Sequence, residues 1–340
     1  MTLVVASHGL DAITRDMLSR AERLSGGALR VVIAGPGEAA EAPEIRSKAD
    51  FRAAKAYRRI ILRERADATF APSTSGLATM LWATMGTRVR NIGYRGTQAK
   101  VRRSDPTNYL ALLNPRVSHI VCETPDIAEA LGHKIPRRKL SVATKPFALE
   151  WVDGALASPL RAEGVGDNDF RLIYVGVSKG RPHKGLRTLL DALRLLVADD
   201  DGYKLTVVGD ADEADMVFAA DLPASFVATT PDATRYLPGS DLYILSSTRD
   251  ASPRTVREAQ ACGVACIVTD IPGARDLIEP GRTGLLVAPD SPEAIAEAIR
   301  TLRRNPGVLS EMSARTRPYI QERFDPEAYA RSFVNLFLNP

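Results

Sequence analysis

The sequence has little of the chemistry on which metal sites and disulfide scaffolds are built. Its 340 residues include only three cysteines and four histidines: Cys122, Cys262, Cys266, His8, His119, His133 and His183. The cysteines have no CxxC spacing and lie in or beside apolar runs, which is typical of small buried side chains. The histidines are far apart and form no HExxH pair. We therefore expect no metal site and a reducing compartment.

Long hydrophobic runs are missing as well. No stretch approaches the ~18 apolar residues that a bilayer-spanning helix needs. The first residues also have none of the basic start, apolar core and cleavage site of a signal peptide. These absences favour a cytoplasmic protein. The length and the hydrophobic fraction of 45% suit two α/β domains.

The first half of the chain is basic and has no excess of acidic residues. Residues 1–150 carry 24 Lys and Arg against 14 Asp and Glu, whereas residues 151–340 carry 21 against 27. This imbalance indicates either an acidic partner for the first half or a basic surface that is simply solvated. We predict no nucleic acid partner.

The densest basic cluster lies on a helix predicted over residues 44–66. One face of this helix is apolar and the other is basic: the apolar residues are Phe51, Ala54, Tyr57 and Ile61, and the basic residues are Arg52, Lys55, Arg59 and Arg63. We expect the apolar face to pack on a sheet. The basic face is either solvated or contacts an anionic membrane at its inner surface or an anionic glycan acceptor.

Short β-rich runs alternate with helical patterns along the whole chain. Further helices are predicted, among others, at residues 108–114, 292–304, 308–322 and 328–337. This alternation predicts an α/β protein with two Rossmann-like domains. A connection rich in Pro and Gly lies at about residues 146–169.

One glycine motif has the spacing of a dinucleotide-binding site and must be weighed as an alternative. Residues 35–40 match the GxGxxA dinucleotide fingerprint, which should open a helix and be followed by an acidic residue about twenty positions later. Pro36 and the Pro-broken stretch up to Pro43 indicate an ordinary loop instead. An NAD-linked oxidoreductase that uses Gly35 and Gly37 is therefore the alternative enzyme class.

The stretch at residues 241–288 reads as strand, loop, helix and strand. A ligand is expected at the carboxyl end of the strand at 243–245, where a polar loop leads into a helix. The backbone N–H groups of Ser252, Arg254 and Thr255 are donors of this helix start and suit a diphosphate. Glu258 lies one turn further and suits vicinal ribose hydroxyls.

A second phosphate-binding loop follows the strand at residues 171–175. Basic residues and glycines lead from it into a helix, which is a sound diphosphate site. The candidate cations are Lys179, Arg181 and Lys184. The loop lacks the GxxxxGK[ST] spacing of a P-loop, so nucleotide hydrolysis is not predicted.

Several of these segments together resemble one family. Asp250 and Glu258 are separated by seven residues, and the motifs Ala261-Cys262-Gly263-Val264, Thr269-Asp270-Ile271-Pro272-Gly273 and Gly281-Arg282-Thr283-Gly284 follow. This part of the chain is similar to the donor-binding half of the retaining GT-B glycosyltransferases of family four, also known as group 1. The resemblance implies two Rossmann-like domains that face a central cleft. It covers the second half well and the first half loosely.

The resemblance also implies domain limits and site residues. We expect an acceptor-binding domain at residues 1–150, a nucleotide-sugar-binding domain at 151–322 and a helix at 323–340 that crosses back to the first domain. The implied catalytic residues are Lys184, Arg181, Asp250 and Glu258. The implied donor-binding residues are Gly9, Lys179, Thr230, Ser252, Pro253, Arg254, Thr255 and Glu258.

An acceptor site is expected in the first half. Gly9 follows the first predicted strand and permits close approach, and His8 is either an acceptor or donor contact or an ordinary surface residue. Arg95 ends another strand, where many relatives place a His, and begins a positive loop. The acceptor-binding candidates are His8, Arg95, Lys100, Arg102 and Arg103.

We therefore expect a metal-independent transferase of the cell envelope, and the resemblance implies that it retains the configuration of the sugar. It would move a sugar from a nucleotide diphosphate sugar to an acceptor hydroxyl on an anionic or membrane-associated glycan or glycolipid, with no cofactor besides that co-substrate. The alternatives are the NAD-linked oxidoreductase and a non-catalytic protein that binds glycan or membrane on a transferase scaffold.

Overall fold

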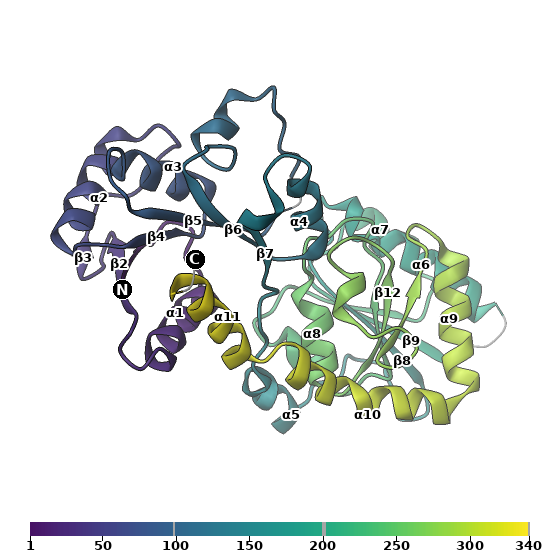
Figure 1. Cartoon of the computed structure of the whole chain (residues 1–340). Helices are drawn as coiled ribbons and strands as arrows, with labels where there is room; N and C mark the ends of the chain where they lie inside the picture. Colours follow the sequence, from purple (N-terminus) through teal and green to yellow (C-terminus); the bar gives the residue numbers. More distant parts are fainter. Residues whose placement is uncertain (98, 199–201, 339–340) are drawn as a thin grey trace. The chain divides into compact units, whose positions relative to one another are not determined.

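The chain forms two α/β units, each built around one parallel sheet (Figure 1). The computed structural model describes residues 1–97, 99–198 and 202–338. The first unit comprises residues 1–146 together with the chain from Phe324 onward, and the second comprises residues 147–323. The two Rossmann-like domains predicted from the sequence are confirmed.

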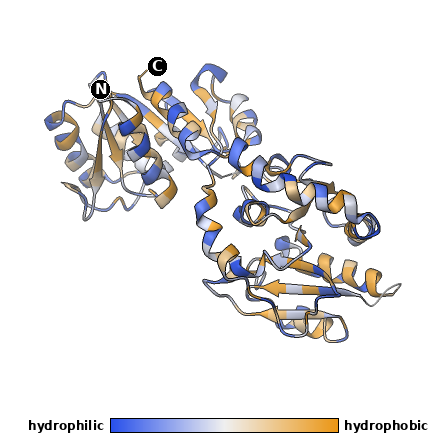
Figure 2. Ribbon diagram, turned by 90° about the horizontal axis from the view of Figure 1, so that it is seen from below, coloured by the Kyte–Doolittle hydropathy of each residue, from blue (hydrophilic) through white to orange (hydrophobic). Residues whose placement is uncertain are grey.

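The first unit contains a seven-stranded parallel sheet in the order β3-β2-β1-β4-β5-β6-β7. The strands are β1 (Thr2–Ala6), β2 (Arg30–Gly35), β3 (Ala40–Glu41), β4 (Ala68–Ala71), β5 (Arg90–Arg95), β6 (Val117–Cys122) and β7 (Leu140–Val142). Short runs of apolar residues form these strands because helices cover both faces of the sheet. Figure 2 shows the strands mainly in the colours of apolar residues.

Alternation along β1 divides the core of the first unit into two layers. Val4 and Ala6 pack with α2 and α3, whereas Leu3 and Val5 face the opposite layer with α1 and α11. Side chains point to alternate faces of a strand, so each layer receives every second residue. The α-helices are α1 (Ala12–Leu24), α2 (Phe51–Arg63), α3 (Thr74–Ala83), α4 (Pro125–Gly132) and α11 (Pro326–Leu338), and short 3₁₀ turns lie at Pro106–Leu110 and Arg137–Lys139.

The last helix, α11, contributes its apolar face to this unit. Phe333 and Phe337 are buried and lie with their ring centroids 5.8 Å from that of Phe70 on β4. The guanidinium of Arg90 donates a hydrogen bond to the Phe337 carbonyl. Helix α11 packs beside α1, as Figure 1 shows.

The second unit contains a six-stranded parallel sheet in the order β10-β9-β8-β11-β12-β13. The strands are β8 (Phe170–Val175), β9 (Tyr203–Val208), β10 (Ala224–Val227), β11 (Leu242–Leu245), β12 (Ala265–Thr269) and β13 (Gly284–Val287). The α-helices are α5 (Asp153–Ala157), α6 (Leu186–Val197), α7 (Glu213–Phe218), α8 (Arg254–Ala261), α9 (Pro292–Arg304) and α10 (Pro306–Arg323). Helices α6 and α9 cover one face, and α8 contacts β11 and β12.

Two predicted helices are shorter than expected. The helix predicted over residues 44–66 begins at Phe51, because the Asp50 carboxylate accepts a hydrogen bond from the Ala53 N–H at 3.0 Å and caps the helix there. Phe51 is 60% exposed and does not belong to the apolar face. The helix predicted at residues 108–114 is only a 3₁₀ turn at Pro106–Leu110.

The dinucleotide fingerprint is not placed as an NAD site requires. Gly35 ends β2, and the following turn leads into the short strand β3, so no helix starts at this glycine motif. The N-terminal helix dipole that would hold a pyrophosphate is therefore missing from this position. In the part of the chain that the structure describes, no helix is long and apolar enough to cross a membrane.

Candidate functional site

The strand order of the second unit creates a ligand-binding edge between β8 and β11. Chain connections leave β8 toward β9 and β10 on one side, and β11 leads toward β12 and β13 on the other. Loops that diverge from neighbouring parallel strands leave a crevice at their carboxyl ends, which is where open α/β sheets bind ligands. Val175 and Leu245 are the last residues of these two strands.

A pocket of about 240 Å³ opens at this edge. The residues that line it are Tyr174, Val175, Gly176, Val177, Arg181, Lys184, Leu245, Ser247, Asp250, Ser252, Pro253, Arg254 and Thr255. They come from β8, the basic glycine loop, the end of β11 and the start of α8. Seven residues of the predicted site therefore line one pocket: Arg181, Lys184, Asp250, Ser252, Pro253, Arg254 and Thr255.

The central contact of the pocket is an ion pair between Lys184 and Asp250. Lys184 Nζ lies 2.6 Å from Asp250 Oδ2, and the two side chains are 25% and 15% exposed. Gly185, the next residue, lets the loop that carries Lys184 lie close to the end of β11. It adopts a left-handed conformation with φ +71°, and a Cβ there would lie 1.9 Å from the Ser246 carbonyl oxygen. Only a glycine lets the loop come so close to the end of β11.

The second ion pair joins Arg254 and Glu258 along α8. Arg254 Nε lies 2.8 Å from Glu258 Oε1, and the Glu258 side chain is only 13% exposed. Burial raises the pKa of Glu258, while the nearby Arg254 and Arg257 oppose that shift. The guanidinium of Arg254 also lies over the Trp151 ring, 5.6 Å from its centroid. Glu258 does not line the pocket itself but is held one turn behind its rim.

The start of α8 supplies backbone donors to the pocket. Pro253 occupies the N-cap position and forms no side-chain cap. The helix therefore leaves its first N–H groups available toward the pocket, where they favour an anion. The Ser252 N–H contacts Asp250 Oδ1 at 3.4 Å, so this donor is already partly used.

Sequence reasoning missed two hydroxyl groups in the pocket. Tyr174 and Ser247 are 2% and 0% exposed, and neither hydroxyl oxygen has a hydrogen-bond partner among the described residues. The position of Ser247, two residues after the end of a buried strand at the ligand-binding edge, was the available signal. Tyr174 lies inside a strand and gave no signal, because only tertiary packing places it in the pocket lining and leaves its hydroxyl without a partner among the described residues.

Besides Glu258, two more predicted donor-binding residues of the second unit, Lys179 and Thr230, lie outside the lining of the pocket. The Lys179 side chain is exposed, and its backbone N–H donates to the Asp210 carbonyl at 3.0 Å. Thr230 accepts a hydrogen bond from the Asp232 N–H at 3.1 Å. Arg181, by contrast, lines the pocket, so it rather than Lys179 accompanies Lys184.

The predicted residues of the first unit gather at the carboxyl edge of its own sheet. Gly9 has φ +81°, and the Ser73 hydroxyl after β4 donates to the His8 carbonyl at 3.0 Å. This places His8 and Gly9 beside the point where the order of that sheet reverses, between β1 and β4. Arg95 ends β5, and its guanidinium donates to the Ala99 carbonyl at 2.7 Å.

The positive loop after β5 is only partly arranged around Arg95. Burial lowers the pKa of Arg95. Lys100 and Arg102 are exposed, and Arg103 donates to the His133 carbonyl at 3.2 Å. Arg103 is thereby tied to the loop after α4. Among the residues that the structure describes, no group of three or more His, Cys, Asp or Glu side chains is placed to hold a metal ion.

Comparison with known proteins agrees with the geometry of the second unit. Residues 169–305 match the model of the family described as glycosyl transferases group 1. The lipopolysaccharide core biosynthesis glycosyltransferase LpsE of Rhizobium meliloti is 28% identical over 229 residues, which are 64% of this chain and 63% of that protein. The capsular polysaccharide biosynthesis glycosyltransferase CapM of Staphylococcus aureus is 25% identical over 182 residues, 51% of this chain and 47% of that protein. The chain thus spans about half to two thirds of these relatives.

Solved structures resemble the chain over its whole length. A glycosyltransferase from Rickettsia africae has a TM-score of 0.80 at 20% identity, covering 99% of this chain and 98% of that one. HepE of Anabaena, solved in complex with UDP, has a TM-score of 0.75 at 16% identity and covers 99% of both chains. At these identities the likeness shows the fold. Residues 169–305 therefore match the group 1 glycosyltransferase family model, and the chain that carries them has the GT-B fold.

Proposed function

We propose that this protein transfers a sugar from a nucleotide diphosphate sugar to an acceptor hydroxyl, with retention of configuration. The observation that carries the proposal is the pocket at the ends of β8 and β11, where Lys184, Arg181 and the start of α8 meet the carboxylate of Asp250. Cations and amide dipoles suit a diphosphate, and an acidic side chain suits sugar hydroxyls. The group 1 match over residues 169–305 supports the same function.

The chemical task of the pocket is to stabilise a leaving diphosphate. Negative charge grows on the phosphate oxygens as the bond to the sugar breaks, so cations that are already in place lower the barrier. Lys184 and Arg181 provide two such cations, and α8 adds its dipole. These groups support a transfer that requires no metal ion.

The two carboxylates take different parts in this proposal. Asp250 lines the pocket and would accept hydrogen bonds from hydroxyls of the donor sugar, once Lys184 moves from the carboxylate to a phosphate oxygen. Glu258 lies one turn further along α8 and would accept hydrogen bonds from the two ribose hydroxyls. The ribose would then replace Arg254 as its partner.

The acceptor proposed for the first unit is a glycan or glycolipid of the cell envelope. Relatives named for lipopolysaccharide core and capsular polysaccharide biosynthesis support this class. A surface of the first unit suits an anionic membrane: Arg52, Lys55, Arg59 and Arg63 are exposed on α2 together with the apolar Phe51 and Leu62. Met85 is exposed as well, and its carbonyl accepts a hydrogen bond from Arg58 on α2 at 2.6 Å. Basic side chains with exposed apolar neighbours favour binding at a bilayer interface.

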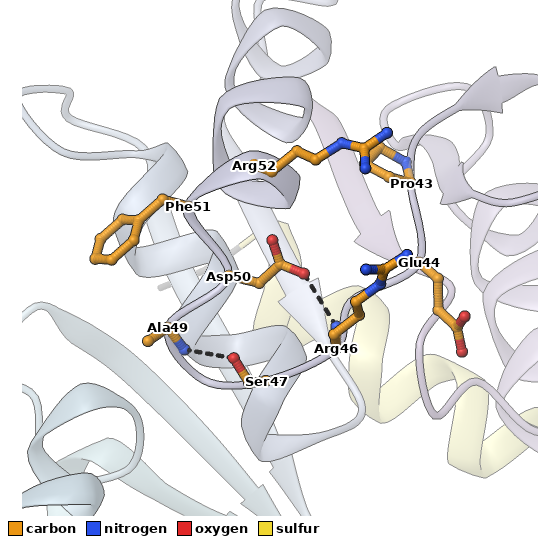
Figure 3. Close-up of a pocket in the computed structure, with 8 residues that line it drawn as sticks. All are labelled: Pro43, Glu44, Arg46, Ser47, Ala49, Asp50, Phe51 and Arg52. Atoms are coloured by element: carbon orange, nitrogen blue, oxygen red, sulfur yellow. Dashed lines mark hydrogen bonds between the residues drawn. The ribbon is translucent and has the colours of Figure 1, made fainter.

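The start of α2 shows how this surface is built (Figure 3). A hollow of about 380 Å³ lies between α2 and the preceding loop. Arg52 reaches toward Pro43 across it, and Phe51 points away from it. The loop is held by the Arg46 N–H, which donates to the Asp50 carboxylate at 3.1 Å. The Arg52 cation and the Phe51 ring therefore lie at the start of α2, directly after a loop that is held by its own hydrogen bond.

A thermal-shift panel tests the donor part of this proposal. UDP, GDP, ADP, dTDP, their sugar derivatives and NAD are added separately to the full chain. A ligand that binds the folded state raises the melting temperature. We expect one nucleoside diphosphate and its sugar derivative to do so and NAD to do nothing. Stabilisation by NAD alone would instead support the oxidoreductase alternative.

Vesicle sedimentation tests the membrane part. We expect the protein to bind vesicles that contain phosphatidylglycerol more strongly than vesicles of phosphatidylcholine alone. Arg59→Glu on α2 should weaken that binding, whereas the matched control Arg304→Glu, on an exposed cation of α9, should not. Equal loss in both variants would mean that α2 is not the contact surface.

A further inference from the structure

We infer that Tyr174 and Ser247 are further donor-binding residues, whose hydroxyls donate hydrogen bonds to phosphate oxygens of the nucleotide diphosphate sugar. The inference rests on the proposed function and extends its site to two residues outside the basic and acidic groups already described. Both side chains line the pocket that contains Lys184 and Arg181. Each adds a neutral hydroxyl donor to a pocket that already contains the cations of Lys184 and Arg181.

The Tyr174 hydroxyl is held next to the glycine loop. The residue is 2% exposed, and a Cβ built on Gly176 would lie 3.5 Å from the hydroxyl oxygen. The phenol therefore lies beside the backbone that borders the pocket, while its ring packs in the core with α6. Burial, with a smaller contribution from the charge of Asp250, raises the pKa of Tyr174, so the group stays protonated and can donate.

Ser247 approaches the pocket from the neighbouring strand end. It is completely buried, and its backbone carbonyl accepts a hydrogen bond from the Thr269 hydroxyl at 2.6 Å. That bond fixes the backbone of Ser247 but uses no part of its side chain. Ser247 lines the pocket, and its Oγ is buried without a partner among the described residues.

Unpaired buried hydroxyls are costly, so two in one pocket require an explanation. A buried donor without an acceptor loses its hydrogen bonds to water and gains nothing in return. Tyr174 and Ser247 come from different strands yet line the same pocket beside the same cations. A ligand with several anionic oxygens would satisfy both hydroxyls at once, and a diphosphate is such a ligand.

Two single-atom variants separate this role from a structural one. Tyr174→Phe and Ser247→Ala remove only the hydroxyl. If the hydroxyls serve the ligand, the free variants should melt at the wild-type temperature or above it, because an unpaired polar group has been removed. If instead the hydroxyls support the fold through trapped water, both variants should melt at a lower temperature.

The matched control is Tyr57→Phe in the first unit. The Tyr57 hydroxyl is buried but donates to the Ala34 carbonyl at 2.9 Å, so its removal breaks an existing bond. This variant should melt at a lower temperature than the wild type. Its affinity for a nucleoside diphosphate should stay unchanged, since the residue is outside the second unit.

The experiment is calorimetric titration of the wild type and the three variants with UDP, GDP, ADP and dTDP in turn, together with their melting temperatures. We expect the dissociation constant of the diphosphate that binds the wild type to rise about tenfold in each pocket variant, as for a lost hydrogen bond to a charged group. If the wild type binds the diphosphate and both pocket variants bind it with unchanged dissociation constants, the inference is wrong but the proposed function stands. The same holds if both pocket variants melt at lower temperatures than the wild type. Absence of binding to the wild type would overturn the proposed function first.

Discussion

At the scale of single residues, the site is held by paired charges. Lys184 contacts Asp250, and Arg254 contacts Glu258, so each of these two cations already has a carboxylate partner. Three of the four side chains are mostly buried, and Arg254 is the exposed one. A nucleotide diphosphate sugar would exchange these partners, since it carries both the anionic oxygens that the cations need and the hydroxyls that the carboxylates need.

Replacing Lys184 should damage transfer much more than it damages folding. Lys184→Ala removes a cation that faces the leaving diphosphate, and we expect the rate of transfer to fall by ~10² to 10³, as for other lost transition-state donors. The control is Arg315→Ala, which removes an exposed cation of α10 from its surface pair with Glu311. Steady-state kinetics should show near-wild-type turnover for this control. Equal kinetics for all three proteins would contradict the role of Lys184.

Glu258 should make stability depend on pH with a defined sign. Its folded-state pKa is raised, chiefly by burial, so its contribution to stability is complete below the unfolded pKa of about 4.3 and is lost as pH rises through the folded value. The amide that replaces the carboxyl in Glu258→Gln does not titrate. Urea denaturation of this variant should therefore show its unfolding free energy improving relative to wild type as the pH rises above the unfolded pKa of about 4.3. A pH-independent difference between the two proteins would contradict this account.

At the scale of elements, most strands and helices follow from local pattern. The helix predicted at residues 292–304 is α9 with the same limits, because Ser291 caps it and Pro292 suits its first turn. The start of α2 was mispredicted because helix-forming residues precede it, while the cap formed by Asp50 decides where it begins. Local propensity cannot reveal which of several polar residues forms the cap.

Part of the site could also be predicted from local sequence pattern. Arg181, Lys184 and Asp250 occur in recognisable loops at strand ends, and the parallel sheet brings those ends together. Lys179 and Arg181 could not be ranked from spacing, since the direction of a side chain in a loop depends on its backbone turn. Tyr174 looks like an ordinary core residue in the sequence, and only its packing shows that its hydroxyl has no partner among the described residues.

The turn before α6 offers a test of how the loop positions Lys184. Gly185→Ala should be strongly destabilising, because the new Cβ would collide with the Ser246 carbonyl in addition to the ~1–2 kcal/mol cost of a left-handed residue. Gly180→Ala is the matched control: Gly180 has φ +66° in the same loop, but its Cβ would meet open space. Denaturation should show only the conformational cost for Gly180→Ala. Equal losses would mean that the close approach at Gly185 contributes nothing.

At the scale of the whole molecule, each unit has its own core. The C-terminal helix α11 belongs to the first unit, although the entire second unit lies between it and β7 in the sequence. Its aromatic side chains fill the layer on one face of β1 and β4. The stability of the first unit therefore depends on the last segment of the chain, while the pocket depends on the second unit.

The variant Phe333→Ala should destabilise the first unit without affecting ligand binding by the second unit. The side chain is buried against Phe70, Tyr329 and Phe337, and truncation of such a residue costs about 3–5 kcal/mol. Calorimetry should show a lowered transition for the first unit, while a nucleoside diphosphate still stabilises the second. The exposed residue Arg331 of the same helix gives the control Arg331→Ala, which should change neither transition. Loss of nucleotide binding in folded Phe333→Ala would contradict independent cores.

The most direct test of the central claim is a crystal structure of the protein with the nucleoside diphosphate that stabilises it best. We predict that the diphosphate lies at the carboxyl ends of β8 and β11, with Lys184 moved from Asp250 to a phosphate oxygen and with Glu258 bonded to the ribose. A diphosphate bound elsewhere, with the Lys184–Asp250 pair intact, would contradict the account.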